Sequence, residues 1–279
     1  MADAELTLGL WQDGGSPGDI AANLDRIGLA AGQARAQGVD LLIFPECFLT
    51  GYFRDRGVRE VAARVDGPVR ASLAGIAAAT GVALLVGTYE SSGDAVYNGA
   101  VCVTPEHGEI ARYRKRALYG AWEKATFRRG TGPVVFEYLG LRIGVLICFD
   151  MEFPELCREL GGQGVDLIAV PTALMAPFDR IAIHMVPTRA MENEVFVAYA
   201  NRTGAEAALR YVGRSSVVSP MGEVLADLTE TETGLAVAPI RKTERDRARA
   251  AFCYGAELPE ITSQGRALDE AVRRPDGSS

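Results

Sequence analysis

The sequence predicts an α/β fold, a single domain in which helices cover buried β-strands and two halves are built alike. Segments with apolar residues at helical spacing alternate with short runs that are apolar throughout, which is typical of strands buried on both faces. The pentapeptide Gln-Gly-Val-Asp-Leu occurs at residues 37–41 and again at 163–167, each time after a predicted helix and before a strand that ends in proline. We therefore predict one domain over residues 1–255, followed by a C-terminal tail over 256–279.

The first half opens with a strand and a helix. Glu5–Trp11 has the apolar character of a strand, and Asp19 begins a helix whose apolar stripe ends near Gly38. The apolar run Val39–Phe44 then predicts a strand buried on both faces, and a proline ends it. Glu46 is the next residue, so we expect its carboxylate at the carboxyl end of that strand.

Two further strand ends carry residues of chemical interest. Lys115 closes one predicted strand and Cys148 follows another, with a looped stretch from Arg116 to Pro133 between them. The other predicted elements are helices over 68–80, 184–194 and 242–251 and strands over 82–90, 96–104, 109–115, 134–138, 141–147, 196–201, 212–219 and 234–238.

Composition and charge limit the classes of partner. With 279 residues, 48% of them hydrophobic and 23% charged, the chain can bury a large core by itself. Its net charge of −7 provides no basic surface for nucleic acid or an anionic membrane. The uncharged stretch Ala71–Tyr89 is long enough for a membrane helix, but Thr80 and Gly81 interrupt it, which indicates helix, turn and strand. We expect a small-molecule ligand and neither of those larger partners.

The cysteines and the start of the chain suggest a cytoplasmic location. Five cysteines are an odd number and show no paired or metal-like spacing, as expected where thiols stay reduced. The first residues lack the basic segment and apolar run of a secretory signal.

Histidine chemistry is disfavoured, which directs attention to other nucleophiles. His107 lies in a polar turn, and His184 has no Cys or Ser pattern beside it, so surface or packing roles are the simpler interpretation. A nucleophile that acts without histidine needs a carboxylate to take its proton and a cation to hold the oxyanion. The strand ends at Glu46, Lys115 and Cys148 offer these three groups. Taken singly, Cys148 would be interpreted as a packed thiol, and Glu46 or Lys115 as a member of a structural ion pair.

Three sequence blocks resemble the motifs of the nitrilase superfamily, and they occur in that family's order. They are Phe-Pro-Glu-Cys-Phe-Leu-Thr-Gly-Tyr at 44–52, Tyr-Arg-Lys at 113–115, and Leu-Ile-Cys-Phe-Asp-Met-Glu-Phe-Pro-Glu at 146–155. Residues 170–172 and 190–201 are also similar to the family, so the resemblance extends from about residue 5 to about residue 240.

The resemblance implies an α-β-β-α sandwich that pairs into a four-layered homodimer, with a Glu-Lys-Cys triad that needs no metal or other cofactor. By position, Glu46 is the general base, Lys115 stabilises the oxyanion, and Cys148 is the nucleophile. Glu123 occupies the place of the second glutamate that many members have after the lysine. Ala117 stands where the family usually has a histidine, which leaves the subfamily open.

The function that these residues favour is hydrolysis of a small aliphatic or amino-acid-like carboxamide to the acid and ammonia. A nearby Lys115 is expected to lower the pKa of Cys148 towards the thiolate, and the Phe149 N–H to be a second oxyanion donor. Tyr52 and Trp122 are candidate substrate contacts, although packing is the simpler role for the tryptophan.

Three alternatives remain open at this stage. The segment Cys148-Phe-Asp150 looks more like the amidase branches than like the Cys-Trp-Glu of nitrilases or the Cys-Trp-Asp of N-carbamoyl-amide hydrolases. Either of those activities is an alternative, as is a catalytically silent scaffold, against which the intact Glu-Lys-Cys set argues.

Overall fold

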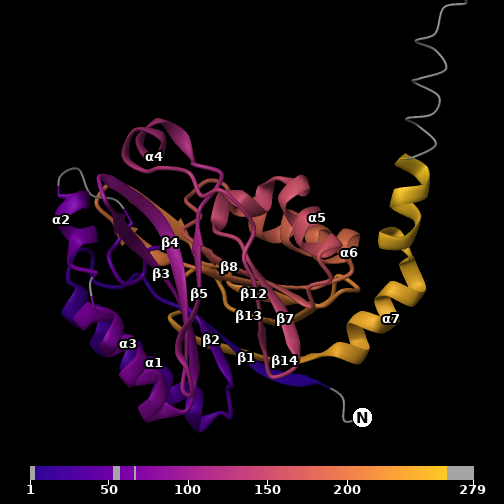
Figure 1. Ribbon diagram of the computed structural model, residues 1–279, viewed down its shortest axis with the longest axis horizontal. Coiled ribbons are helices and arrows are strands. Elements are labelled where there is room, and N and C mark those ends of the chain that lie inside the picture. The colour runs from indigo at the N-terminus through magenta and orange to yellow at the C-terminus, as the bar shows by residue number, and fades with distance from the viewer. Residues whose placement is uncertain (1–3, 53–56, 66, 263–279) are drawn as a thin grey trace, which may run out of the picture.

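The computed structural model describes residues 4–52, 57–65 and 67–262. Within these residues two six-stranded sheets pack face to face, and helices cover the outer face of each, which gives four layers in the order α-β-β-α (Figure 1). The α/β sandwich predicted from the sequence is therefore confirmed. None of the helices in the described residues is long and apolar enough to cross a membrane.

The first sheet has the strand order β14-β1-β2-β3-β4-β5. Its central strands β1, β2 and β3 run parallel, and the others are antiparallel to their neighbours. Helices α1, α2 and α3 lie on its outer face (Figure 1). The bounds are β1 Glu5–Gln12, α1 Ile20–Ala36, β2 Leu41–Ile43, α2 Val58–Ala63, α3 Gly67–Thr80, β3 Ala83–Ser92, β4 Ala95–Thr104, β5 Gly108–Arg114 and β14 Gly234–Arg241.

The second sheet has the order β13-β12-β9-β8-β7-β6, with β7, β8 and β9 parallel. Helices α5 and α6 cover its outer face, whereas α7 lies to one side of the sandwich (Figure 1). The bounds are β6 Val135–Tyr138, β7 Leu141–Val145, α5 Pro154–Gly162, β8 Leu167–Thr172, a π-helical turn Ile181–Met185, α6 Val186–Asn193, β9 Phe196–Asn201, β12 Ser216–Val218, β13 Val224–Asp227 and α7 Lys242–Phe252.

Two hydrophobic cores hold the layers together. Between the sheets, alternate residues of β1, among them Leu8 and Leu10, are fully buried and pack with residues such as Ile143 of β7. Between the first sheet and its helices, Ile27 of α1 and Leu73 of α3 are fully buried in a second cluster. Each such side chain contributes about 1.5–3 kcal/mol relative to an exposed one, so the paired strands are fixed in register by what they bury.

The repeated pentapeptide marks equivalent places in the two halves. Asp40 accepts a hydrogen bond from the Thr7 N–H of β1 at 2.8 Å, and Asp166 accepts one from the Arg142 N–H of β7 at 2.6 Å. In both cases the aspartate ties the start of a central strand to the strand beside it. The β1-β2-β3 and β7-β8-β9 units therefore correspond.

The two halves meet at the carboxyl ends of their central strands. The backbone N–H of Glu46, just after β2, donates to the carbonyl oxygen of Thr172 at the end of β8, at 3.2 Å. Ligand sites in α/β folds gather at such strand ends. This junction is where the predicted site residues lie.

The structure differs from the predicted elements in several places. The stretch predicted as a loop after Lys115 contains a short helix, α4 (Gly120–Thr126), because seven residues are too few to show helical periodicity in the sequence. The strand predicted over 212–219 is broken, since Gly213 and Arg214 both have positive φ angles. What precedes the break pairs in a hairpin of β10 (Thr203–Glu206) and β11 (Leu209–Val212).

The predicted C-terminal tail is only partly described. Residues 256–262 are helical, and 263–279 lie outside the described residues. The predicted boundary at residue 255 stays a prediction.

Candidate active site

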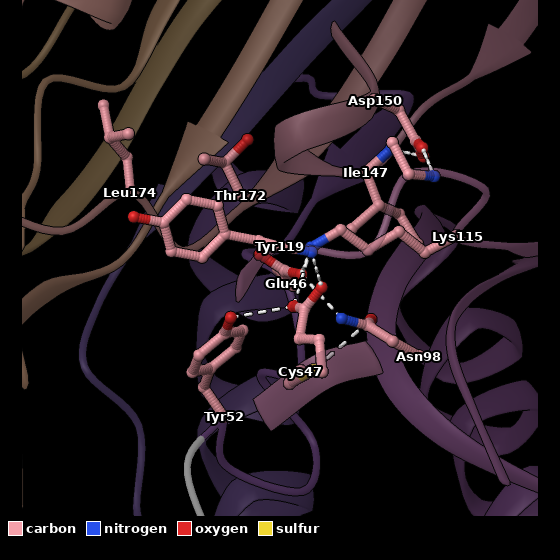
Figure 2. A network of polar contacts seen from close by, with 12 residues as sticks. Glu46, Cys47, Tyr52, Asn98, Lys115, Tyr119, Ile147, Asp150, Thr172 and Leu174 are labelled. Atoms are coloured by element: carbon pink, nitrogen blue, oxygen red, sulfur yellow. Dashed lines mark hydrogen bonds and ion pairs between the residues drawn. The ribbon is translucent and has the colours of Figure 1, made fainter. Parts of the chain in front are cut away.

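Three of the four predicted catalytic side chains are joined directly. The Lys115 ammonium, just after β5, lies 2.7 Å from Oε1 of Glu46 and 2.8 Å from Oε1 of Glu123 (Figure 2). All three side chains are completely buried. Glu46 follows β2 and Glu123 belongs to α4, so the fold brings these residues together from three separate segments.

Burial and charge set the protonation of this network. Burial alone would lower the pKa of Lys115, but Glu46 and Glu123 outweigh it and raise that pKa well above its usual value. Burial raises the pKa of Glu46, and the attraction of Lys115 offsets only part of this effect. The lysine is therefore charged, and removing either carboxylate would weaken the compensation of a buried cation.

Glu46 has one engaged oxygen and one that accepts no hydrogen bond. Its Oε1 accepts from Lys115 and from the Asn98 Nδ2 of β4 at 2.6 Å (Figure 2). Its Oε2 is buried and has no donor among the described residues. Asn98 also accepts from the Cys47 thiol at 3.4 Å, so its amide is held in one orientation. A buried carboxylate oxygen without a donor is available to take a proton.

Glu123 is fully engaged, in contrast to Glu46. Its Oε1 accepts from Lys115 and from the Tyr52 hydroxyl at 2.7 Å, and its Oε2 accepts from the Tyr119 N–H at 2.6 Å. The neighbouring Lys124 is exposed, so Glu123 is not paired with it on the surface. These contacts fix the position of the Lys115 ammonium.

A buried arginine holds the loop that carries Glu46. Arg202, which follows β9, donates to the carbonyl oxygens of Glu46 and Cys47 at 3.4 and 3.3 Å and pairs with Glu206 at 2.9 Å. The Glu206 carboxylate in turn accepts the Tyr52 N–H at 3.1 Å. Both ends of this loop are therefore anchored to the second half of the chain.

Cys148 occupies a turn that exposes its sulfur to a cavity. It is the first residue of a short 3₁₀ helix, Cys148–Glu152, and has a φ of 47°. Residues other than glycine adopt positive φ at some energetic cost, of order 1–3 kcal/mol, and such conformations cluster at functional sites. The turn ends β7 abruptly and directs the thiol towards the junction of the two sheets.

The pKa of the Cys148 thiol is raised, contrary to the sequence-based expectation. Burial raises its pKa well above the usual value and the charge of Glu46 adds to this, whereas Lys115 and the Ala173 N–H oppose it. The expected effect of Lys115 is present, but burial outweighs it. The cysteine therefore needs a base to take its proton.

Asp150 links the lysine to the cysteine. One of its oxygens accepts the two backbone N–H groups that directly follow Lys115, at 3.1 and 2.6 Å. The other accepts the Ile147 N–H at 3.0 Å (Figure 2) and the Tyr113 hydroxyl at 2.8 Å. A single buried carboxylate thus holds the end of β5 against the turn that begins with Cys148.

Beside Cys148 lies a cavity of about 110 Å³ with mostly apolar walls. It is lined by Tyr52, Tyr119, Cys148, Phe149, Glu152, Ala173, Leu174, Met175, Phe178 and Ile181. A larger surface depression of about 730 Å³, near β10 and β11, is lined by none of the predicted catalytic residues. The smaller cavity is the candidate substrate site, because it is apolar and contains the thiol.

Of the three predicted substrate contacts, two lie in the cavity wall and one packs behind it. Tyr52 and Phe149 line the cavity. Trp122 is not among its described lining residues and packs instead against Tyr52 and Phe127, with ring centroids 5.8 and 5.5 Å apart.

Sequence reasoning did not assign roles to Asn98, Asp150 or Glu152. Asn98 lies inside an otherwise apolar strand, which is a signal of a buried polar role. Asp150 and Glu152 lie two and four residues after Cys148, inside the third motif block. No group of three or more His, Cys, Asp or Glu side chains in the described residues is placed to hold a metal ion.

Comparison with known proteins agrees with this arrangement. A family model for carbon-nitrogen hydrolases matches residues 8–261. The chain is 42% identical to a nitrilase from Pyrococcus abyssi, over 75% of this chain and 79% of that protein. It is 33% identical to an (R)-stereoselective amidase from a Pseudomonas species, with 88% of each covered.

A solved structure of an amidase is also similar to this chain. A mutant amidase from Nesterenkonia sp. AN1, in which acrylamide has added to the active-site cysteine, has a TM-score of 0.80 and 35% identity, covering 84% of this chain and 92% of that one. Since the family model and these relatives span most of its length, the chain belongs to the carbon-nitrogen hydrolase family, within the nitrilase superfamily.

Proposed function

We propose that this hydrolase is an amidase that converts a small carboxamide to its acid and ammonia through a thioester on Cys148. The observation that carries the proposal is the unengaged Oε2 of buried Glu46, which lies in one network with Lys115. The relatives support it, since one is an (R)-stereoselective amidase and another an amidase modified at its active-site cysteine.

In the first half-reaction the Cys148 sulfur attacks the amide carbon while its proton passes to Glu46 Oε2. The carbonyl oxygen becomes an oxyanion, which the Lys115 ammonium and the Phe149 N–H stabilise. One such donor contributes about 3–4 kcal/mol. The tetrahedral intermediate collapses by breaking the carbon–nitrogen bond, and the protonated Glu46 returns its proton to the departing nitrogen, which leaves as ammonia.

In the second half-reaction a water molecule attacks the thioester carbon. Glu46 takes one proton of that water, and the same two donors hold the second oxyanion. When the carbon–sulfur bond breaks, the proton passes from Glu46 to the sulfur, and the free acid leaves. The resting state with a protonated Cys148 is restored, in agreement with the raised pKa of that thiol.

Glu123 takes no part in these proton transfers. Both of its oxygens are engaged with Lys115, Tyr52 and Tyr119. Its role is to hold the lysine ammonium where the oxyanion forms, since misplacement of a catalytic group by about 1 Å costs roughly 100-fold in rate.

The test is ammonia release from an amide, a nitrile and an N-carbamoyl compound that share one small acyl group. We expect the amide to be the best substrate and the Cys148→Ala variant to be inactive on all three. Preference for the nitrile, as in the Pyrococcus abyssi relative named nitrilase, would replace the amidase assignment. Preference for the carbamoyl compound would indicate the corresponding hydrolase, and inactivity on every compound would favour the silent scaffold.

We also propose that the protein is a homodimer. Phe153, Ile183, Met191 and Tyr254 are 37–45% exposed near α5, α6 and α7, and exposed apolar residues in one region favour self-association. Light scattering should give at least twice the monomer mass of 29.8 kDa. The monomer mass at micromolar concentration would contradict the proposal.

The cytoplasm is the location we propose for this protein. All five cysteines are free thiols, and Cys253 is exposed. Outside the cell, an oxidising environment would favour disulfide formation by such an exposed thiol, so free cysteines fit the reducing cytoplasm.

A further inference from the structure

Glu152 lies in the substrate cavity but has no place in the proposed chemistry. It is the last residue of the short helix that begins with Cys148, and its side chain lines the same cavity. The other lining residues are apolar or aromatic apart from the thiol, so Glu152 is the sole carboxylate among the cavity-lining residues that the structure describes.

The two cations whose charges act on the Glu152 carboxylate, Lys115 and Arg189, donate their hydrogen bonds to other groups. Lys115 donates to Glu46 and Glu123. Each of the three guanidinium nitrogens of Arg189, on α6, donates a hydrogen bond: to the carbonyl oxygen of Met151 at 2.9 Å, to the backbone carbonyl of Glu152 at 2.8 Å and to the Glu192 carboxylate at 2.9 Å.

No hydrogen bond or ion pair to the Glu152 carboxylate occurs within residues 4–52, 57–65 and 67–262. This separates it from the other acids of the site. Glu46 and Asp150 each accept at least two hydrogen bonds, and Glu123 accepts three. Glu152 is therefore not explained as a structural ion pair.

The cavity is an unfavourable place for a carboxylate without a partner. Burial raises the pKa of Glu152 to about 7, although Lys115 and Arg189 act in the opposite direction. A half-buried acid in an apolar wall loses hydration that only another polar group restores. A positively charged group on a bound ligand would restore it best, because hydrogen bonds between ions are about twice as strong as neutral ones.

Resting on the proposed amidase function, we propose that the substrates are short amides whose acyl group carries a protonated amine, and that the Glu152 carboxylate binds this amine. The cavity of about 110 Å³ restricts the chain between the amine and the amide to a few carbon atoms. Glu152 is then the specificity-determining residue, and the apolar walls hold the short carbon chain.

The test uses three short-chain amides that differ in charge at the end remote from the amide. They are 3-aminopropanamide, its neutral isostere butanamide, and the anionic 3-carboxypropanamide, assayed at pH 8 where the amine is mostly protonated. We expect wild-type kcat/KM to favour the cationic amide over the neutral one by at least about 10-fold. In Glu152→Gln this preference should disappear, because kcat/KM for the cationic amide should fall to about that for butanamide.

The anionic amide gives a signature that a merely structural role would not produce. Wild type should hydrolyse it poorly, and Glu152→Gln should hydrolyse it at least about threefold better, since the repulsion is gone. The matched control is Glu155→Gln, an exposed acid that does not line the cavity, and it should keep the wild-type order of substrates.

The outcomes separate this inference from the proposed function. Hydrolysis of butanamide tests the amidase activity, whereas the order of the three amides tests Glu152. Calorimetric binding of the same amides to Cys148→Ala, with and without Glu152→Gln, gives the order even if no amide is hydrolysed. A wild-type preference for the neutral amide, or a cationic preference that survives Glu152→Gln in both assays, would overturn the inference.

Discussion

Both halves of the sandwich use an aspartate to hold the start of a central strand, but the surroundings of the two aspartates differ. Asp40 and Asp166 both fix the start of a central strand through a neighbouring backbone N–H. Asp40 is partly exposed, whereas the Asp166 side chain is completely buried and forms an ion pair with Arg245 of α7. The second half therefore has an attachment point for α7 that the first half lacks.

The difference is greater at the opposite ends of these strands. After β2 the first half supplies Glu46, and after β5 it supplies Lys115, so it provides the carboxylate and the ammonium that form the ion pair. After β7 the second half supplies Cys148, and after β8 it supplies Ala173 and the apolar wall of the cavity. The repeated framework is structural, and the chemistry lies where the halves differ.

The largest effect should come from the nucleophile of the second half. Cys148→Ala removes the atom that forms the thioester, so kcat/KM for the amide should fall by at least about 10⁴-fold. The melting temperature should change little, because the thiol lines a cavity and the substitution removes a single atom. The control is Cys253→Ala, at an exposed thiol of the same half, which should keep full activity. Amide hydrolysis that persists in Cys148→Ala would show that the nucleophile is not this residue of the second half.

The next effect should come from the base of the first half. Glu46→Gln keeps the size of the side chain but removes the oxygen that takes the proton, so kcat should fall by about 10³-fold. Steady-state kinetics would measure it, and a thermal melt would show that the fold persists. Loss of less than about 10-fold would mean that another group takes the proton from Cys148.

A smaller loss is expected for the positioning glutamate. Glu123→Gln weakens the hold on the Lys115 ammonium and should lower kcat/KM by at least about 100-fold, or ~2.7 kcal/mol. Lys124→Gln, at the next residue, is the control and should leave kcat/KM nearly unchanged. Near-normal activity in Glu123→Gln beside an inactive Glu46→Gln would limit the machinery to Glu46, Lys115 and Cys148.

The smallest effects concern the two aspartates of the repeat and are measured as stability. Asp166→Asn weakens a buried ion pair and should reduce the free energy of unfolding by about 2–3 kcal/mol. Asp40→Asn keeps an oxygen that accepts the Thr7 N–H and should cost only about 0.5–1 kcal/mol. Urea denaturation of both variants gives the comparison directly. Equal losses of unfolding free energy in the two variants would show that the ion pair between Asp166 and α7 adds no stability.

Patterns that are local in the sequence predicted much of the fold and site. Continuous apolar runs located the buried strands that precede Glu46 and Cys148, and a polar turn indicated the strand that ends at Lys115; the three residues lie at the ends of β2, β7 and β5. The repeated pentapeptide indicated the pseudo-symmetry, which the paired aspartates show.

What the sequence did not predict depends on contacts across the fold. Asn98 reaches Glu46 only because β3 and β4 pair in a particular register, and no local pattern specifies that contact. The raised pKa of Cys148 follows from its burial, which outweighs the neighbouring lysine that sequence reasoning considered. The short helix α4, which carries Glu123, is stabilised by contacts outside its own seven residues.

The bonds of Asp150 determine how the site responds to motion. This residue belongs to the turn after β7 in the second sheet, yet it holds the backbone that follows β5 in the first. A displacement of one sheet relative to the other therefore moves Lys115 and Cys148 together. These hydrogen bonds couple the segment that carries the cation to the turn that carries the sulfur, so the two reacting groups are positioned by one side chain.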